Sequence, residues 1–178
     1  MKMKNFYYLH VWAITGFDEK TLYKEGQPIN KEGIGIEIDF WPSDDLFCFP
    51  PLFFCTERLR AILLNKGFHK LGFHKIDRIA KGANFLGNFP DADLPPYYWE
   101  ICFTGVIGVD DFALWDNNFL VVSDTALKCL RDNHVTHAES DLITIEFEQY
   151  FNSSRKFFWM ADSFKEYFIK MEHKKKNK

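Results

Sequence analysis

A strand, a helix cap and the start of a helix follow one another in Phe119-Leu120-Val121-Val122-Ser123-Asp124-Thr125-Ala126-Leu127. The four apolar residues before Ser123 are typical of a short buried strand. The Ser123 hydroxyl can accept a hydrogen bond from a backbone amide that has no partner at the start of a helix. We therefore expect a strand over 118–122 and a helix over 124–131. The residues expected to face the core from this helix are Ala126, Leu127 and Leu130.

The same order of residue types occurs 67 positions earlier in the chain. The apolar run 52–55 precedes Thr56, which can cap a helix that begins at Glu57 and ends near Gly67. At this offset Thr56 aligns with Ser123, and the acidic residue after each cap favours the helix dipole. The alignment predicts an internal repeat, at about 48–76 and 115–143, in which each copy is a strand–helix–strand unit.

The rest of the chain predicts further strands and one more helix. The segment 34–40 alternates apolar with small or acidic residues, as a strand with one buried face does. The segment 142–151 fits a strand or a helix equally well. Further strands are expected at 6–14, 71–76 and 97–107, and a helix at 163–170. The expected fold is a single α+β domain over residues 1–173, with a mixed or antiparallel sheet, followed by a disordered basic tail at 174–178.

Composition restricts the class of protein. A chain of 178 residues suits one domain, and an aromatic content of 18% with 20 Phe predicts an aromatic-rich core. The net charge of −3 argues against general nucleic-acid binding. No apolar run is long enough to span a membrane. The cysteines show no C-x-x-C spacing, so we expect buried free thiols in a reducing, cytoplasmic compartment. They are Cys48, Cys55, Cys102 and Cys129.

Charged residues are unevenly distributed along the chain. No Lys or Arg occurs between Gly82 and Leu127, a region that contains several acidic residues. One interpretation is an acidic surface that is simply solvated. The other is a face matched to a basic partner, because complementary charge accelerates encounter and selects partners.

Several residues were considered for catalysis or metal binding. His134 and His137 could approach a metal together with Cys129, but the segment follows a helix end and lacks the helical i, i+4 spacing. Cys55 and Cys129 are expected to face the core, where burial disfavours the reactive thiolate. Ser123 lacks the flanking glycines of a hydrolase nucleophile. The segment Gly82–Asn88 has glycines spaced as in a phosphate loop but no Lys-Ser/Thr. We therefore expect no catalytic residue, no metal and no cofactor.

Three stretches together resemble a bacterial immunity-protein family. Phe112-Ala113-Leu114-Trp115, the strand–Ser123–helix segment after it, and Asn133 to Glu139 resemble the closing "LVVS…AL..L" segment of that family. The stretch 52–59 is similar to its first segment, with Cys55-Thr56 in place of the usual Val-Ser. Tyr98-Trp99-Glu100-Ile101 is similar to its middle strand. The resemblance covers roughly residues 46–139.

The family belongs to polymorphic-toxin and contact-dependent competition systems. The resemblance implies a cytoplasmic, non-enzymatic protein that binds and neutralises a cognate toxin, and it assigns no catalytic residue to this chain. A basic toxin would dock on an acidic face that carries aromatic anchors. The residues expected in that face are Asp91, Asp93, Tyr97, Tyr98, Asp110, Asp111, Trp115 and Asp116.

Two other functions compete with this expectation. One is a small enzyme whose site gathers Asp110, Asp111, His134 and His137. The other is a structural or regulatory adaptor without a toxin partner. The sequence does not separate the adaptor from the immunity protein, and it says nothing about oligomeric state.

Overall fold

The computed structural model describes residues 5–21, 23–24, 27–28, 33–42, 44–115, 118–135 and 139–142. All but the last of these residues belong to one compact unit, Met1–Asp141. The unit combines helices with mostly antiparallel sheets, so the predicted α+β class is confirmed. The predicted helix, which starts at Asp162 or Ser163 and ends at Lys170, and the tail at 174–178 lie outside the described residues, as does the ambiguous segment 142–151 apart from Leu142.

The described strands are β1 (Phe6–His10), β2 (Thr15–Phe17), β3 (Tyr23–Lys24), β4 (Gln27–Pro28), β5 (Ile36–Ile38), β6 (Leu46–Phe49), β7 (Leu52–Cys55), β8 (Leu71–Ile76), β9 (Ile79–Lys81), β10 (Tyr98–Phe103), β11 (Phe112–Trp115), β12 (Phe119–Ser123) and β13 (Glu139–Leu142). The described helices are α1 (Glu57–Asn65), α2 (Ala83–Asn88) and α3 (Asp124–Asp132).

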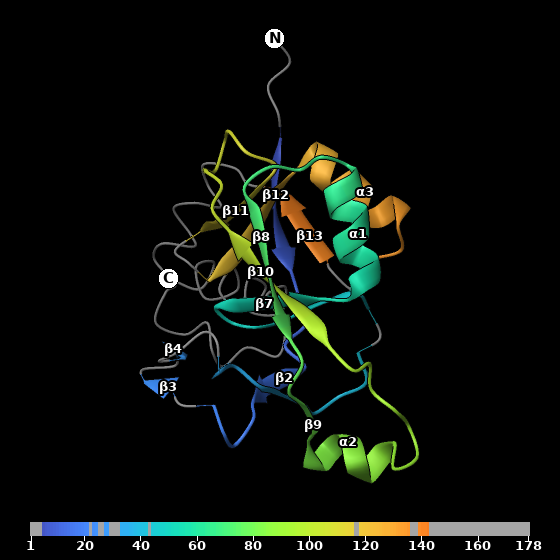
Figure 1. Ribbon diagram of the computed structural model, residues 1–178. Coiled ribbons are helices and arrows are strands. Elements are labelled where there is room, and N and C mark those ends of the chain that lie inside the picture. The colour runs from blue at the N-terminus through green and yellow to red at the C-terminus, as the bar shows by residue number, and fades with distance from the viewer. Residues whose placement is uncertain are drawn as a thin grey trace, which may run out of the picture. The chain divides into compact units, whose positions relative to one another are not determined.

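Two four-stranded sheets have the same internal order (Figure 1). In the first module the order is β6-β7-β10-β8, and α1 connects β7 to β8. In the second module the order is β11-β12-β1-β13, and α3 connects β12 to β13. A hairpin therefore supplies the first two strands of each sheet, and the strand after the helix forms the other edge.

The third strand of each sheet comes from the part of the chain that precedes the other module. Strand β1 precedes the first module but pairs antiparallel with β12 of the second, with Phe6 opposite Ser123. Strand β10 precedes the second module but pairs antiparallel with β7 of the first, with Trp99 opposite Cys55. All four strands of the first sheet therefore lie within residues 46–103, whereas the second sheet takes its inner strand β1 from the chain before the first module.

The predicted strand–cap–helix units are confirmed in both modules. Helices α1 and α3 each have nine residues, and their starts differ by the predicted offset of 67. The Thr56 hydroxyl accepts a hydrogen bond from the Leu59 amide at 3.3 Å, and the Ser123 hydroxyl accepts one from the Ala126 amide at 3.2 Å. Whether the two modules arose by duplication stays a prediction.

An aspartate that the sequence analysis did not pair with a cap supports each cap from the preceding hairpin. Asp111 directly precedes β11, and its carboxylate accepts a hydrogen bond of 2.6 Å from the Ser123 hydroxyl. Its carbonyl also accepts one from the Ser123 amide at 2.9 Å. Asp45 directly precedes β6 and makes the matching pair of hydrogen bonds with Thr56, through its carboxylate and its carbonyl. The capped helix is thereby tied to its own hairpin twice.

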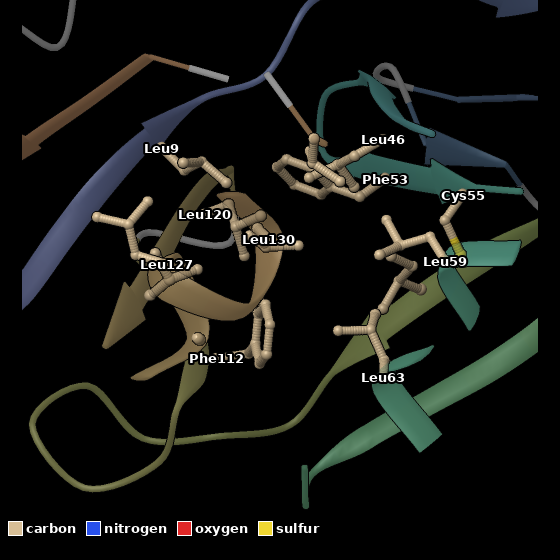
Figure 2. Packing of buried hydrophobic residues seen from close by; sticks show 14 of the residues in the cluster. Leu9, Leu46, Phe53, Cys55, Leu59, Leu63, Phe112, Leu120, Leu127 and Leu130 are labelled. Carbon is tan, nitrogen blue, oxygen red and sulfur yellow. The ribbon is translucent and has the colours of Figure 1, made fainter. Parts of the chain in front are cut away.

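The two modules share one apolar core. Leu59 and Leu63 of α1 and Leu127 and Leu130 of α3 belong to a single buried cluster, together with side chains of both sheets. Figure 2 shows the leucines of the two helices on opposite sides of this interior, with Phe112 between them. Burial of large apolar side chains is the main favourable term in folding, so this cluster joins the modules energetically.

A second apolar cluster lies on the other face of the first module. It contains Ile36 and Ile38 of β5, Phe54 of β7, Tyr98 of β10 and Phe85 of α2. Strand β5 runs antiparallel to β2 and parallel to β9. Helix α2 is therefore anchored on this second cluster, whereas α1 and α3 share the first.

An ion pair fastens the segment after β2 to the start of β9. Arg78 Nε lies 2.6 Å from Asp18 Oδ2, and the guanidinium also donates to Thr21 at 2.9 Å and to the Gly33 carbonyl at 2.6 Å. Burial opposes ionisation of Asp18, but the hydrogen bonds from Arg78 and Thr21 outweigh burial and lower its pKa below the usual value. Asp18 and Arg78 are 60 residues apart, and no local pattern indicates their pairing.

Both module helices end in the same way. Gly67 follows the C-cap of α1 with a φ of 72°, as predicted for a glycine in the left-handed region. His134 occupies the corresponding place after α3 with a φ of 62°. The Val135 amide donates to the Leu130 carbonyl at 3.0 Å and the His134 amide to the Arg131 carbonyl at 3.0 Å, which is the Schellman pattern. His134 therefore terminates a helix.

Replacement of His134 by glycine is expected to stabilise the protein. Left-handed backbone costs a residue with a Cβ about 1–2 kcal/mol, so His134→Gly should raise the free energy of unfolding by about 1 kcal/mol. Gly67→Ala at the matching position should lower it by a similar amount. Urea denaturation of both variants measures the effect. A loss of stability in His134→Gly would show that the imidazole has a role besides ending α3.

Three sequence expectations are wrong in detail. The strand predicted over 97–107 ends at Phe103, and the chain turns at 106–110, where the Val109 and Asp110 amides donate to the Val106 carbonyl. The strand predicted over 6–14 ends at His10. Phe40, expected on the buried face of its strand, lies beyond the end of β5 and is exposed.

Candidate functional site

The residues predicted to form one acidic face lie at two ends of a strand. Asp91 and Asp93 precede β10, whereas Asp110 and Asp111 follow it. A strand of six residues spans about 20 Å. Whether these four aspartates share one face stays a prediction. Asp116 lies outside the described residues.

The aspartates after β10 are engaged within the fold. The Asp110 carboxylate accepts a hydrogen bond from the Val106 amide at 2.8 Å and so closes the β10–β11 loop. Asp111 accepts the hydrogen bond from the Ser123 hydroxyl described above. These contacts account for both residues as structural groups.

The aromatic residues predicted as exposed anchors have different surroundings. Tyr98 is 1% exposed, so the expectation of an exposed ring is wrong, and burial raises its pKa to about 12. Tyr97 is half-buried, with Lys75 Nζ 4.5 Å from its ring centroid. Trp115 is half-buried at the end of the second-module hairpin, opposite Phe119. The error at Tyr98 arises because the sequence after Pro95-Pro96 does not show which face of the strand each tyrosine ring occupies.

The cysteines and the serine that the sequence offers as nucleophiles are buried. Burial raises the pKa of the Cys48 thiol to about 12, and it also raises the pKa values of Cys55 and Cys129. A protonated thiol is a poor nucleophile. Ser123 is fully buried, and its hydroxyl caps α3. His137 lies outside the described residues. Within the described ranges, no group of three or more His, Cys, Asp or Glu side chains could hold a metal ion.

Three large apolar side chains stand exposed around α2. Trp41, Leu86 and Phe89 are 44%, 48% and 40% exposed. The Trp41 ring stacks on the buried Phe85 ring with centroids 5.8 Å apart, and it lies 5.5 Å from the Phe89 ring. Phe85 belongs to the second apolar cluster, so Trp41 is held against an anchored ring. We name Trp41, Leu86 and Phe89 the α2 patch.

Carboxylates lie close to the start of α2. A methyl group at Gly82, the N-cap of α2, would collide with the Asp39 carboxylate and lie 3.1 Å from the Glu37 carboxylate. Asp93 lies 3.8 Å from the ammonium of Lys81, the residue before Gly82. Asp91 is exposed two positions after Phe89. We name Glu37, Asp39, Asp91 and Asp93 the acidic rim.

A second exposed apolar group lies in the β10–β11 loop. Val106 and Val109 are 60% and 66% exposed, and Ile107 is partly exposed. The Asp110 carboxylate and the Val109 amide both bond to Val106, so the loop has a defined shape. The two exposed apolar groups belong to different parts of the fold, since α2 packs on the second cluster and this loop joins the two modules.

Two residues of the acidic rim, and none of the α2 patch, are among the predicted partner-binding residues. Asp91 and Asp93 were included because of the region without basic residues. Trp41 and Phe89 are 48 positions apart, and only the packing of both rings on α2 brings them together. One sequence signal was present: Phe85, Leu86 and Phe89 have the i, i+1, i+4 spacing of an apolar helix face.

Comparison of the chain with protein-family models, with curated proteins and with solved structures finds no match. Among the described residues, no helix has the length and apolar character needed to cross a membrane.

Proposed function

We propose that this protein is a non-enzymatic immunity protein, which binds a cognate bacterial toxin in the cytoplasm and blocks it. The observation that carries the proposal is the α2 patch, a group of exposed large apolar side chains in which the Trp41 and Phe89 rings contact each other. Large exposed apolar side chains rimmed by polar groups mark interaction sites. Tryptophan is also strongly enriched among residues that dominate binding energy.

Further support comes from the residues that resemble the immunity-protein family. The "LVVS" segment forms β12 and the cap of α3, and the middle-strand segment forms β10. These residues build the shared framework and leave the exposed surface free to differ between partners. The free cysteines, three of them buried, are compatible with a reducing compartment.

A toxicity-protection experiment tests the proposal. The toxin domain encoded by the neighbouring gene would be expressed under an inducible promoter, with and without this protein. We expect growth to be restored and the two proteins to co-purify as a stoichiometric complex. A toxin domain that kills cells equally in the presence of this protein would contradict the proposal, whereas protection without a complex would favour an enzyme.

A further inference from the structure

We infer that the α2 patch and its acidic rim form the docking surface for the partner. The matching surface of the partner is basic, with lysine or arginine side chains beside apolar ones. This inference rests on the proposed function, because it names the chemistry of the partner. It differs from the face expected from the sequence, since Tyr98, Asp110 and Asp111 are not part of it.

The α2 patch is prepared for binding without rearrangement. Trp41 rests on Phe85, which is fully buried, and contacts Phe89, whose ring lies 5.6 Å from that of Phe85. A side chain that is already held loses little conformational entropy when a partner covers it. The three rings therefore form a rigid aromatic platform with one exposed side.

Charge determines which partner fits. The acidic rim contributes two carboxylates beside the N-cap of α2 and two from the segment after α2, and Lys81 forms an ion pair with Asp93. No Lys or Arg occurs from Gly82 to Leu127, so α2 and the segment after it contribute only negative charge. An acidic partner would be repelled, whereas a basic one would be attracted at long range and would associate faster.

The aromatic platform adds a short-range preference for the same partner. A guanidinium or ammonium over the face of a tryptophan ring is attracted by the ring quadrupole. Arg60 shows this contact within the fold, with its guanidinium carbon 4.0 Å from the Trp99 ring centroid. Trp41, which is 44% exposed, is an aromatic ring that a partner cation can contact in the same way.

Peptide binding tests the inference directly. The probes are two fluorescently labelled synthetic helical peptides of one length, one with lysine and leucine on a face and the other with glutamate in place of lysine. Fluorescence anisotropy would give the affinity of the full chain for each. We expect the lysine peptide to bind at least about tenfold more tightly than the glutamate peptide, with an affinity that falls as salt rises.

Matched variants localise the binding. Trp41→Ala and the double variant Asp91→Lys/Asp93→Lys should each weaken binding of the lysine peptide about tenfold or more. Asp132→Lys on α3 makes a charge reversal away from the patch, and Val106→Ser/Val109→Ser removes the other exposed apolar group. Both controls should bind as the wild type does. Circular dichroism checks that all variants are folded.

Several results would overturn the inference. One is failure of the wild-type chain to prefer the lysine peptide, and another is equal weakening by Asp132→Lys, which would indicate nonspecific attraction. Sedimentation that shows a dimer lost in Trp41→Ala would assign the patch to a second copy of the chain. If the patch variants still protect cells from the toxin, the docking surface is elsewhere and the immunity function stands. If the wild type gives no protection, the proposed function fails whatever the peptides show.

Discussion

Phe112→Ala is expected to lower the free energy of unfolding by about 3–5 kcal/mol and to leave a single cooperative transition. Phe112 begins β11 of the second module and is 2% exposed. The centroid of its ring lies 5.1 Å from that of Phe68 and 6.1 Å from that of Phe103. Both residues belong to the first module: Phe68 lies between α1 and β8, and Phe103 ends β10. Truncation therefore removes packing from the contact between the modules.

The single transition follows from the shared core. Leu59 and Leu63 of α1 lie in one buried cluster with Leu127 and Leu130 of α3, so unfolding of one module would expose apolar side chains of the other. Chemical denaturation followed by both fluorescence and circular dichroism measures the effect. Leu86→Ala, which truncates an exposed residue, should change stability by less than about 0.5 kcal/mol. Two separate transitions in Phe112→Ala would show that the modules fold independently.

Ser123→Ala is expected to destabilise the protein by about 2 kcal/mol, which is at the upper end for loss of a helix cap. The Ser123 hydroxyl both accepts from the Ala126 amide and donates to Asp111, and the residue is fully buried. Its removal leaves a helix-start amide and a carboxylate oxygen without this partner. Thr56→Ala should have a smaller effect, because Thr56 is only half-buried.

A double-mutant cycle separates the cap from its support. Asp111→Ala combined with Ser123→Ala should cost less than the sum of the single variants, with a coupling of about 0.5–3 kcal/mol. Thr125→Ala, at an exposed position in the first turn of α3, is the control and should be close to neutral. Additive losses would mean that Asp111 and Ser123 act independently, and that the hydrogen bond between them contributes little.

Local structure was predictable wherever the deciding contacts lie within a few residues. The caps at Thr56 and Ser123, the glycine after α1 and the inward face of α3 were all predicted correctly. Each depends on a hydroxyl or a backbone angle that acts within one helical turn. Helix α2 was missed because its six residues include a glycine and its N-cap has no side chain to accept a hydrogen bond.

The candidate site was much less predictable than the fold. The region without basic residues includes Asp91 and Asp93, which lie near α2, and also Asp110 and Asp111, which bond within the fold, because charge along a sequence does not reveal which residues pair with a cap or a loop. Trp41 escaped notice because an isolated tryptophan is more often buried than displayed. Its role depends on Phe85 and Phe89, which come from a different element.

The sequence by itself determined the α+β class and the two matched strand–cap–helix units, because these depend on short-range hydrogen bonds and apolar periodicity. Tertiary structure alone decided that β1 joins the second module and β10 the first. It also decided that Asp45 and Asp111 hold the caps, and that Trp41 and Phe89 meet on α2. Strand pairing and ring packing depend on contacts between residues that are distant in sequence. Many such contacts compete, and only the folded chain shows which of them form.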